Sequence, residues 1–198
     1  MKLFWSNASP YARKVRIAAR ELGLADRIEE ITVDAFADPP ELLAATPLGR
    51  IPVLVLDEGT AIFDSRVICA YLEEFAGGGM VPAQPRECLA VMRAEALGDG
   101  GMDVAVLMAL ERRKPEGEKS PTFAARWQTQ LARALDAVAA ELPRLPQAFN
   151  LGHAAFASLL GYVDFRHPGI AWRDTRPELA AWYSEAGTRP SLAATLPQ

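Results

Sequence analysis

The sequence has few cysteines and histidines. Its 198 residues include only two cysteines, Cys69 and Cys88, and neither belongs to a CxxC pair. So few cysteines exclude a disulfide-stabilised scaffold and a cysteine-rich metal site, and they disfavour a dithiol oxidoreductase. The two histidines, His153 and His167, are too isolated to indicate a metal site or a proton-transfer pair. We therefore expect no bound metal.

Long apolar runs and an excess of positive charge are also missing. No apolar run reaches the length that spans a membrane, and the run 3–5 is too short for a secretion signal. The 21 basic and 25 acidic side chains leave a net charge of −4, which disfavours an electrostatic nucleic-acid binder. These absences predict a cytoplasmic protein in a reducing compartment, with neither a membrane nor a nucleic acid as partner.

What is present is typical of a globular protein with two parts. The apolar share is 50% and the charged share is 23%, enough for a sizeable core. Short apolar runs with turn signals fill residues 1–76, whereas residues 86–198 are rich in alanine and have helical periodicity. The segment 77–85 between them is too rich in glycine and proline to continue a helix or strand. The pattern predicts two domains joined by a linker.

The first part has the pattern of a small α/β layer. Its expected elements are a strand, a helix, a strand, a hairpin of two strands and a final helix, at residues 2–5, 11–22, 28–33, 53–56, 61–63 and 65–75. The first three form a parallel βαβ unit. Pro52 directly precedes a strand of the buried type, where a cis Ile51–Pro52 bond suits a tight turn.

The second part is expected to be entirely helical. The expected helices lie at residues 86–112, 121–142, 151–164 and 178–187. The glycine-rich stretch 98–101 indicates either a bend or close helix packing, and packing is the favoured interpretation. Asn150 can cap the third helix, but His153 is not expected to take the part of the carboxylate in a capping box.

Three motifs carry a resemblance to a known family. The βαβ–ββα order, with the turn 51–54 and the helix start at 64–65, resembles the thioredoxin-like domain of glutathione S-transferases. The stretch SPYARKVRIA is similar to the first helix of bacterial, Ser-type, zeta-like or beta-like members, and PLGRIPVL to the family's asparagine-proline-x-glycine-lysine-valine-proline signature. The resemblance implies an α/β thioredoxin-like N-terminal domain followed by an all-α helical bundle, glutathione as cosubstrate, and a homodimer.

Ser9 is the candidate catalytic residue. The pair Ser9-Pro10 is typical of a helix start, and as a plain N-cap it would stabilise the helix by about 1 kcal/mol. A hydroxyl there can also donate to a bound thiolate, which the helix dipole favours. The resemblance places Ser9 where the family keeps the residue that faces the glutathione sulfur. Ser6 and Asn7, on the same loop, are alternatives.

The expected glutathione-binding residues come from two turns. Asp64 and Ser65 start a helix, where a carboxylate and an ammonium group of the peptide would both find partners. The family usually has Glu where Asp64 stands, and an ordinary helix cap explains the pair equally well. Ile51, followed by Pro52, would offer its backbone to the peptide as an added strand does. The alternative is that both residues only set a turn.

Other candidates are less specific. Arg50 and Arg13 are cations that could lie near an anionic peptide, although exposed arginines usually face only water. The pocket for the acceptor substrate is expected between the two domains, lined by Trp5, Asn7, Met102, Asp103 and Val106.

The sequence thus predicts a glutathione transferase that activates the glutathione thiolate for attack on a small electrophile. A glutathione-dependent isomerase of the zeta-like kind is a variant of this prediction. A non-catalytic binding or regulatory protein, like the starvation proteins that resemble transferases, is the alternative from another class. A thiol-transferase is disfavoured because serine stands where an active-site cysteine would be needed.

Overall fold

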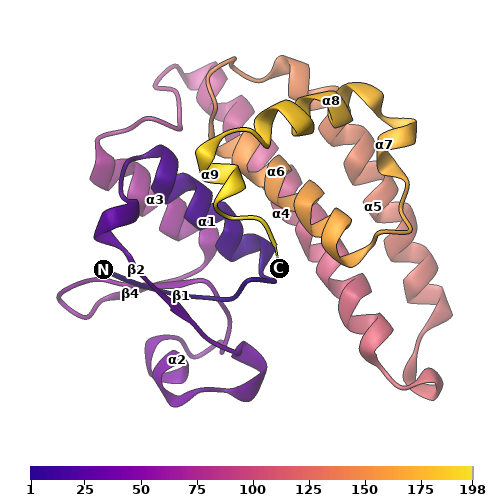
Figure 1. Cartoon of the computed structure of the whole chain (residues 1–198), viewed down its shortest axis with the longest axis horizontal. Helices are drawn as coiled ribbons and strands as arrows, with labels where there is room; N and C mark the ends of the chain where they lie inside the picture. Colours follow the sequence, from indigo (N-terminus) through magenta and orange to yellow (C-terminus); the bar gives the residue numbers. More distant parts are fainter. Residues whose placement is uncertain (198) are drawn as a thin grey trace.

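The structure, a computed structural model, describes residues 1–197. A small sheet with its helices occupies the N-terminal part of the chain, and helices make up the rest (Figure 1). The strands are β1 (Lys2–Trp5), β2 (Glu29–Thr32), β3 (Val53–Val55) and β4 (Ala61–Ile62), in the order β2-β1-β3-β4. Strand β2 is parallel to β1, and β3 is antiparallel to both β1 and β4. The predicted fold class is confirmed.

Helices cover both faces of this sheet (Figure 1). On one face, α1 (Pro10–Glu21) and α3 (Ser65–Ala76) pack on Leu3, Trp5 and Leu54 in the main core. On the other face, Leu42 of α2 (Pro40–Ala45) packs on Phe4 and Val53. Alternate residues of β1 thus face opposite layers, as the pleat of a strand requires. The sequence did not predict α2, which is a short helix started by consecutive prolines.

Turns and single-turn helices complete this part. The Ile51–Pro52 peptide bond is cis, as predicted, and a second cis bond joins Phe63 and Asp64. The hairpin between β3 and β4 closes with a hydrogen bond from the Leu56 amide to the Thr60 carbonyl at 2.8 Å. Two 3-10 helices lie in this part, η1 (Ala25–Arg27) and η2 (Ala35–Ala37), and two lie in the helical part, η3 (Glu116–Glu118) and η4 (Leu142–Arg144).

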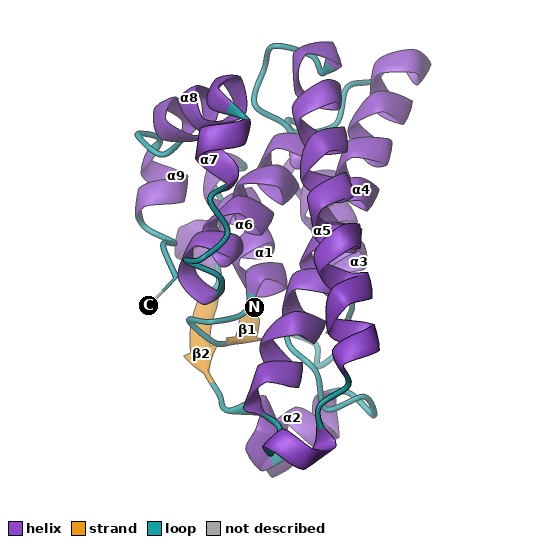
Figure 2. Cartoon of the chain, turned by 90° about the vertical axis from the view of Figure 1, so that its right-hand side faces the viewer, coloured by secondary structure: helices purple, strands orange, loops and turns teal. Residues whose placement is uncertain are grey.

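The helical part contains the four expected helices and two short ones. They are α4 (Pro85–Arg113), α5 (Pro121–Glu141), α6 (Leu151–Arg166), α7 (Trp172–Thr175), α8 (Pro177–Ala186) and α9 (Pro190–Ala193). Helices α4 and α5 run side by side (Figure 2), and α6 lies at the centre, buried on every side from Leu151 to Val163. None of the helices in residues 1–197 has the length and apolar character needed to cross a membrane.

The connection between α3 and α4 contains neither helix nor strand over residues 77–84. The carboxylate of Glu73 accepts hydrogen bonds from the backbone amides of Gly79, Met80 and Val81, each at 2.9 Å. Residues 77–79 are glycines with positive φ, which this tight path requires. The connection is therefore held in one conformation by the end of α3.

Residues near the C-terminus pack back against the N-terminal part. Helix α9 lies beside α1 (Figure 1), and the Arg189 guanidinium pairs with Glu21 at 2.6 Å. Ser191 donates a further hydrogen bond to Glu21. One continuous cluster of buried apolar side chains runs from the sheet through α1 into α4 and α6. The two parts therefore share the main core, whereas the second cluster, around Phe4, Leu42 and Val53, lies on the other face of the sheet.

The start of α6 corrects one expectation. Asn150 caps the helix by accepting from the His153 amide at 3.2 Å, and the Asn150 amide donates to Nδ1 of His153 at 3.3 Å. A neutral imidazole nitrogen is an acceptor, so His153 completes the capping box without a carboxylate. Burial, with a smaller contribution from Arg189, lowers the pKa of His153 to about 4 and keeps the ring neutral. The prediction was wrong because it considered charge rather than acceptor capacity.

The glycines of α4 confirm the prediction of close helix packing. A Cβ at Gly98 would lie 2.7 Å from the Ala155 Cβ and 2.9 Å from the Ala155 carbonyl carbon. A Cβ at Gly101 would lie 2.6 Å from Cδ2 of Leu159. At Gly100, in contrast, nothing lies within 4 Å. Two glycines therefore set the distance between α4 and α6, and the third faces open space.

We expect Gly98→Ala to lower the free energy of unfolding by about 1–3 kcal/mol, because the backbone of α6 would have to move. The matched control is Gly100→Ala, expected to leave stability unchanged or to raise it by up to about 1 kcal/mol through helix propensity. Urea unfolding followed by circular dichroism measures both. Equal effects at the two positions would contradict the packing role of Gly98.

Candidate functional site

Three turns meet at one edge of the sheet. In the pairing of β1 with β3, Phe4 lies opposite Val53, so the end of β1 adjoins the start of β3. In the pairing of β3 with β4, Leu54 lies opposite Ile62, so the end of β4 reaches the same edge. The loop 6–9, the cis turn 51–52 and the helix start 64–65 follow or precede these strand ends directly. The sheet thereby brings together residues that are far apart in the sequence.

Ser9 is the N-cap of α1 at this edge. Its Oγ accepts a hydrogen bond from the Ala12 amide at 3.2 Å, and its own amide donates to the Ser6 carbonyl at 3.1 Å. The hydroxyl hydrogen has no acceptor within the described residues, and the side chain is half-buried. Ser6 is also half-buried, and Asn7 is exposed. The Ser9 hydroxyl can therefore donate to an anion placed beyond the helix, where the dipole favours negative charge.

Asp64 and Ser65 begin α3 at the same edge. Oδ1 of Asp64 accepts from the Arg66 amide at 3.0 Å, so Asp64 is a genuine helix cap. Its side chain is otherwise exposed. Ser65 is only 3% exposed, and its hydroxyl makes no hydrogen bond with any of residues 1–197. The pair leaves one carboxylate and one hydroxyl available beside a helix N-terminus.

The cis turn at Ile51–Pro52 leaves backbone hydrogen-bonding groups available to a ligand. Ile51 is half-buried, and no hydrogen bond in the described chain uses its N–H or C=O. Pro52 is buried beneath it, and Arg50 is exposed. An extended residue with both backbone groups unpaired can accept an added strand.

Asp103 of α4 lies beside the first turn of α1. Oη of Tyr11, two residues after Ser9, donates to Oδ1 of Asp103 at 2.5 Å. Burial and this carboxylate raise the pKa of Tyr11 above its usual value, so the phenol stays protonated. The sequence indicated Tyr11 only as part of an apolar helix stripe. The hydrogen bond joins the first turn of α1 to α4.

The five residues expected to line the acceptor pocket differ in how exposed they are. Asn7 and Asp103 are exposed and Val106 is half-buried. Met102 is completely buried in the main core. Trp5 is buried as well, with the Arg16 guanidinium 3.6 Å from its ring centre.

Arg13 does not face the site, which corrects an expectation. It is only 3% exposed, and Nη1 donates to the Ala157 carbonyl of α6 at 3.0 Å. Nη1 fills the space above Gly161, where a Cβ would lie 1.8 Å away. Arg13 is therefore a core contact between α1 and α6 and is not accessible to a bound peptide.

A network of buried charged side chains joins α1, α3 and α4 next to the site. The Lys14 side chain is fully buried, and its Nζ contacts Oε1 of Glu95 and Oδ2 of Asp99, both at 2.8 Å. Nε of Arg66, the residue after Ser65, donates to the same Asp99 at 2.7 Å. Burial alone would lower the pKa of Lys14. Electrostatic interactions with Cys69, Asp99 and Glu95 outweigh the effect of burial, so the pKa of Lys14 is raised.

The spacing of the acidic residues along α4 was the signal for this network. Glu95, Asp99 and Asp103 follow one another at intervals of four residues, which places them on one stripe of the helix. That stripe faces α1 and α3. The nearby Cys69 is completely buried, and burial raises the pKa of its thiol to about 12, so it is not a nucleophile.

Comparisons with known proteins point to one family. The model of the glutathione S-transferase N-terminal domain matches residues 8–74, and the model of the C-terminal domain matches residues 121–185. A protein of Escherichia coli K12, the uncharacterized GST-like protein YibF, is 33% identical over all of this chain and 98% of its own length. The chain belongs to the glutathione S-transferase family.

Solved structures of this family have the same fold. A glutathione transferase family member from Pseudomonas fluorescens Pf-5, with bound glutathione, has a TM-score of 0.92 and 35% identity, covering 100% of this chain and 98% of that one. A glutathione S-transferase from Methylobacterium radiotolerans, in complex with glutathione sulfonate, has a TM-score of 0.93 and 33% identity. It covers 99% of this chain and 94% of its own.

Proposed function

We propose that this protein is a glutathione transferase that activates the thiolate of glutathione for attack on a small electrophile. One observation carries the proposal. The Ser9 hydroxyl caps α1, its hydrogen has no acceptor among the described residues, and it lies at the same edge of the sheet as the cis turn and the start of α3. Family relatives with bound glutathione support the choice of thiol.

The chain's own groups complement the three parts of glutathione. The γ-glutamyl carboxylate lies at the N-terminus of α3 and accepts from the Ser65 hydroxyl, and the adjacent ammonium group pairs with Asp64. The cysteinyl backbone pairs with the N–H and C=O of Ile51 as an added strand, with Pro52 fixing the turn. Arg50 supplies positive charge beside the peptide. These contacts direct the cysteinyl sulfur to the loop that carries Ser9.

The catalytic role of Ser9 in this proposal is to stabilise the thiolate of glutathione. Its hydroxyl donates to the sulfur, and the dipole of α1 adds positive potential, so the thiol loses its proton to solvent nearer neutral pH. The thiolate then uses its electron pair to form a carbon–sulfur bond with the electrophile, while the bond from that carbon to its leaving group breaks and the leaving group, such as the chloride of chlorodinitrobenzene, departs to solvent with the bonding pair. The acceptor binds between the domain of residues 1–76 and the helical domain of residues 86–198, close to Asn7, Asp103 and Val106.

A homodimer belongs to the same proposal. Large apolar side chains are exposed on α3 and on the first half of α4, at Val67, Leu89 and Met92. Exposed apolar side chains favour association with another protein surface when they gather on one face, and we propose that these do.

Calorimetric titration with glutathione tests the binding half of the proposal. We expect saturable heat with the wild type and an affinity at least about tenfold weaker with Ser65→Ala, because a hydrogen bond to a charged group is lost. Ser184→Ala is the control, since among residues 1–197 that hydroxyl donates only to the Ala180 carbonyl on α8. No saturable heat with the wild type would sink the proposal and favour a binding protein that keeps the fold without the reaction.

A further inference from the structure

The two histidines of the chain lie at opposite ends of α6, the central helix. His153 is in the first turn, and His167 is the C-cap. Both side chains are buried, with exposures of 7% and 2%. Burying a charged group costs free energy unless a partner of opposite charge compensates it. The groups around each ring therefore decide which protonation state the fold accepts.

The contacts of His153 fit a neutral ring. Its Nδ1 accepts from the Asn150 amide at 3.3 Å, and a proton on Nδ1 would turn this acceptor into a donor that faces a donor. The N-terminal end of a helix also disfavours positive charge. Phe149 and Trp182 of α8 stack against the ring, with 5.6 and 5.7 Å between ring centres, and both are uncharged.

The charged residue that acts on His153, among those described, is a cation. Burial lowers the pKa of His153 to about 4, and the positive charge of Arg189 contributes to this. The Arg189 guanidinium lies 4.4 Å from the ring centre of Phe149 and pairs with Glu21 of α1 at 2.6 Å. Glu21 is therefore already engaged, and it leaves no charge over for a protonated His153.

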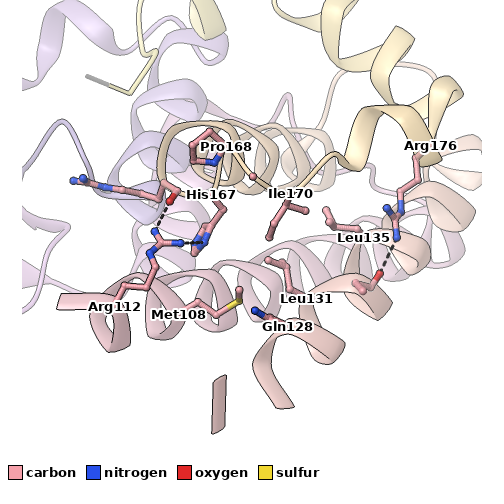
Figure 3. A pocket seen from close by; sticks show the side chains of 12 residues that line it. Met108, Arg112, Gln128, Leu131, Leu135, His167, Pro168, Ile170 and Arg176 are labelled. Carbon is pink, nitrogen blue, oxygen red and sulfur yellow. Dashed lines mark hydrogen bonds between the residues drawn. The ribbon is translucent and has the colours of Figure 1, made fainter. Parts of the chain in front are cut away.

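The contacts of His167 fit a neutral ring as well (Figure 3). Nη1 of Arg112 on α4 lies 2.7 Å from Nδ1, and because a guanidinium can only donate, Nδ1 is the acceptor. Nε2 then carries the hydrogen, which it donates to the Ala105 carbonyl of α4 at 2.8 Å. A proton on Nδ1 would set two donors and two positive charges against each other.

The charged groups that act on His167 are again cations. Burial lowers the pKa of His167, and the charges of Arg112 and Arg166 lower it further, whereas the bond to the Ala105 carbonyl raises it. The end of α6 also favours positive charge, but the guanidinium in contact with the ring opposes it. Tyr162 meets the ring edge-on and is uncharged, with 6.2 Å between ring centres. Within residues 1–197 neither histidine has a carboxylate as ion-pair partner.

We propose that α6 is an acid-sensitive element of the fold, in which protonation of His153 and His167 disrupts both ends of the helix and destabilises the whole chain. Residues 151–163 are all buried, and α6 packs against α1, α4 and α8, so a change at its ends reaches both parts of the molecule.

The sign of the effect follows from proton uptake. Histidines of the unfolded chain bind their protons near pH 6.5, whereas the folded chain resists both, so acid favours unfolding. The stability contributed by the neutral rings is therefore fully present above about pH 6.5. It is lost as the pH falls below that value, and the loss from His153 continues down to its folded pKa of about 4.

Urea unfolding of the full chain at a series of pH values tests this proposal. Between pH 7 and pH 5.5 the unfolding constant of the wild type should rise about eightfold for each histidine that stays neutral in the folded state, in addition to the effect of the carboxylates. The matched variant is His153→Gln combined with His167→Gln, because glutamine keeps an acceptor and a donor but takes up no proton. Its unfolding constant should rise at least about eightfold less over the same range.

The wild type by itself keeps the proposal falsifiable if the double variant does not fold. Proton NMR of the untagged chain follows the ring signals of the two histidines during a pH titration. We expect both rings of the folded protein to stay neutral through pH 6.5. The proposal is overturned if either ring titrates near pH 6.5 or above, or if acid destabilises the double variant as steeply as the wild type. Neither measurement involves glutathione, so the outcome is independent of the transferase proposal.

Discussion

Lys14→Met is expected to lower the free energy of unfolding by about 3 kcal/mol, the lower end of the cost of breaking a buried ion pair. The substitution leaves Asp99 and Glu95 without the ammonium group that both contact at 2.8 Å. Asp99 is only 4% exposed, so its carboxylate would stay desolvated. The cost stays at the lower end because Arg66 still donates to Asp99.

Urea unfolding at neutral pH measures this effect, with Lys119→Met as the control. Lys119 pairs with Glu116 at 2.6 Å, but Glu116 is exposed, and a surface pair contributes at most about 1 kcal/mol. Both substitutions exchange lysine for methionine, so the difference between them isolates burial. Similar losses of stability at the two positions would show that the buried network around Lys14 contributes no more to the free energy of unfolding than a surface ion pair does.

Ser9→Ala is expected to lower kcat/KM for conjugation of chlorodinitrobenzene by about 100-fold, the usual effect of removing one hydrogen bond to a developing anion. The affinity for glutathione should change little, because the γ-glutamyl and backbone contacts lie elsewhere. The pH profile of kcat/KM should move to higher pH, since the thiol of bound glutathione would lose its proton less readily.

Ser6→Ala separates Ser9 from its neighbour. Ser6 lies on the same loop and is half-buried like Ser9, but it does not cap α1. It should retain wild-type turnover and pH profile. Loss of the N-cap in Ser9→Ala also costs the helix about 1 kcal/mol, so thermal unfolding of both variants must accompany the kinetics. Unchanged turnover in Ser9→Ala removes the proposed role, and a loss in Ser6→Ala alone transfers that role to Ser6.

Elements with strong local signals were predictable from the sequence. Helices α4, α5, α6 and α8 were expected to within two residues at each end because each has ten or more residues, enough for a helical pattern to show. The cis bond at Pro52 followed from a proline placed directly before a buried strand. Helices α2, α7 and α9 have four to six residues, too few for a periodic pattern to emerge.

Residues of the site were predictable where they act locally. Ser9 and Asp64 are helix caps, and capping depends only on neighbouring residues. Arg13 and Lys14 could not be placed, because α1 is covered by both α3 and α6 and even its charged residues are buried. Which helix covers which face depends on tertiary packing. Partners such as Ala157 and Asp99 lie more than 80 residues away in the sequence.

The main core, which the sheet shares with the helical part, has a consequence for cooperativity. Leu3 and Val15 belong to the same buried cluster as Leu159 of α6, and α9 returns to pack on α1. Removing either part would expose the apolar surface of the other to water, so neither half retains a complete interior. We therefore expect the chain to unfold as one thermodynamic unit, and we expect a substitution deep in α6 to weaken the candidate site as directly as one in the sheet.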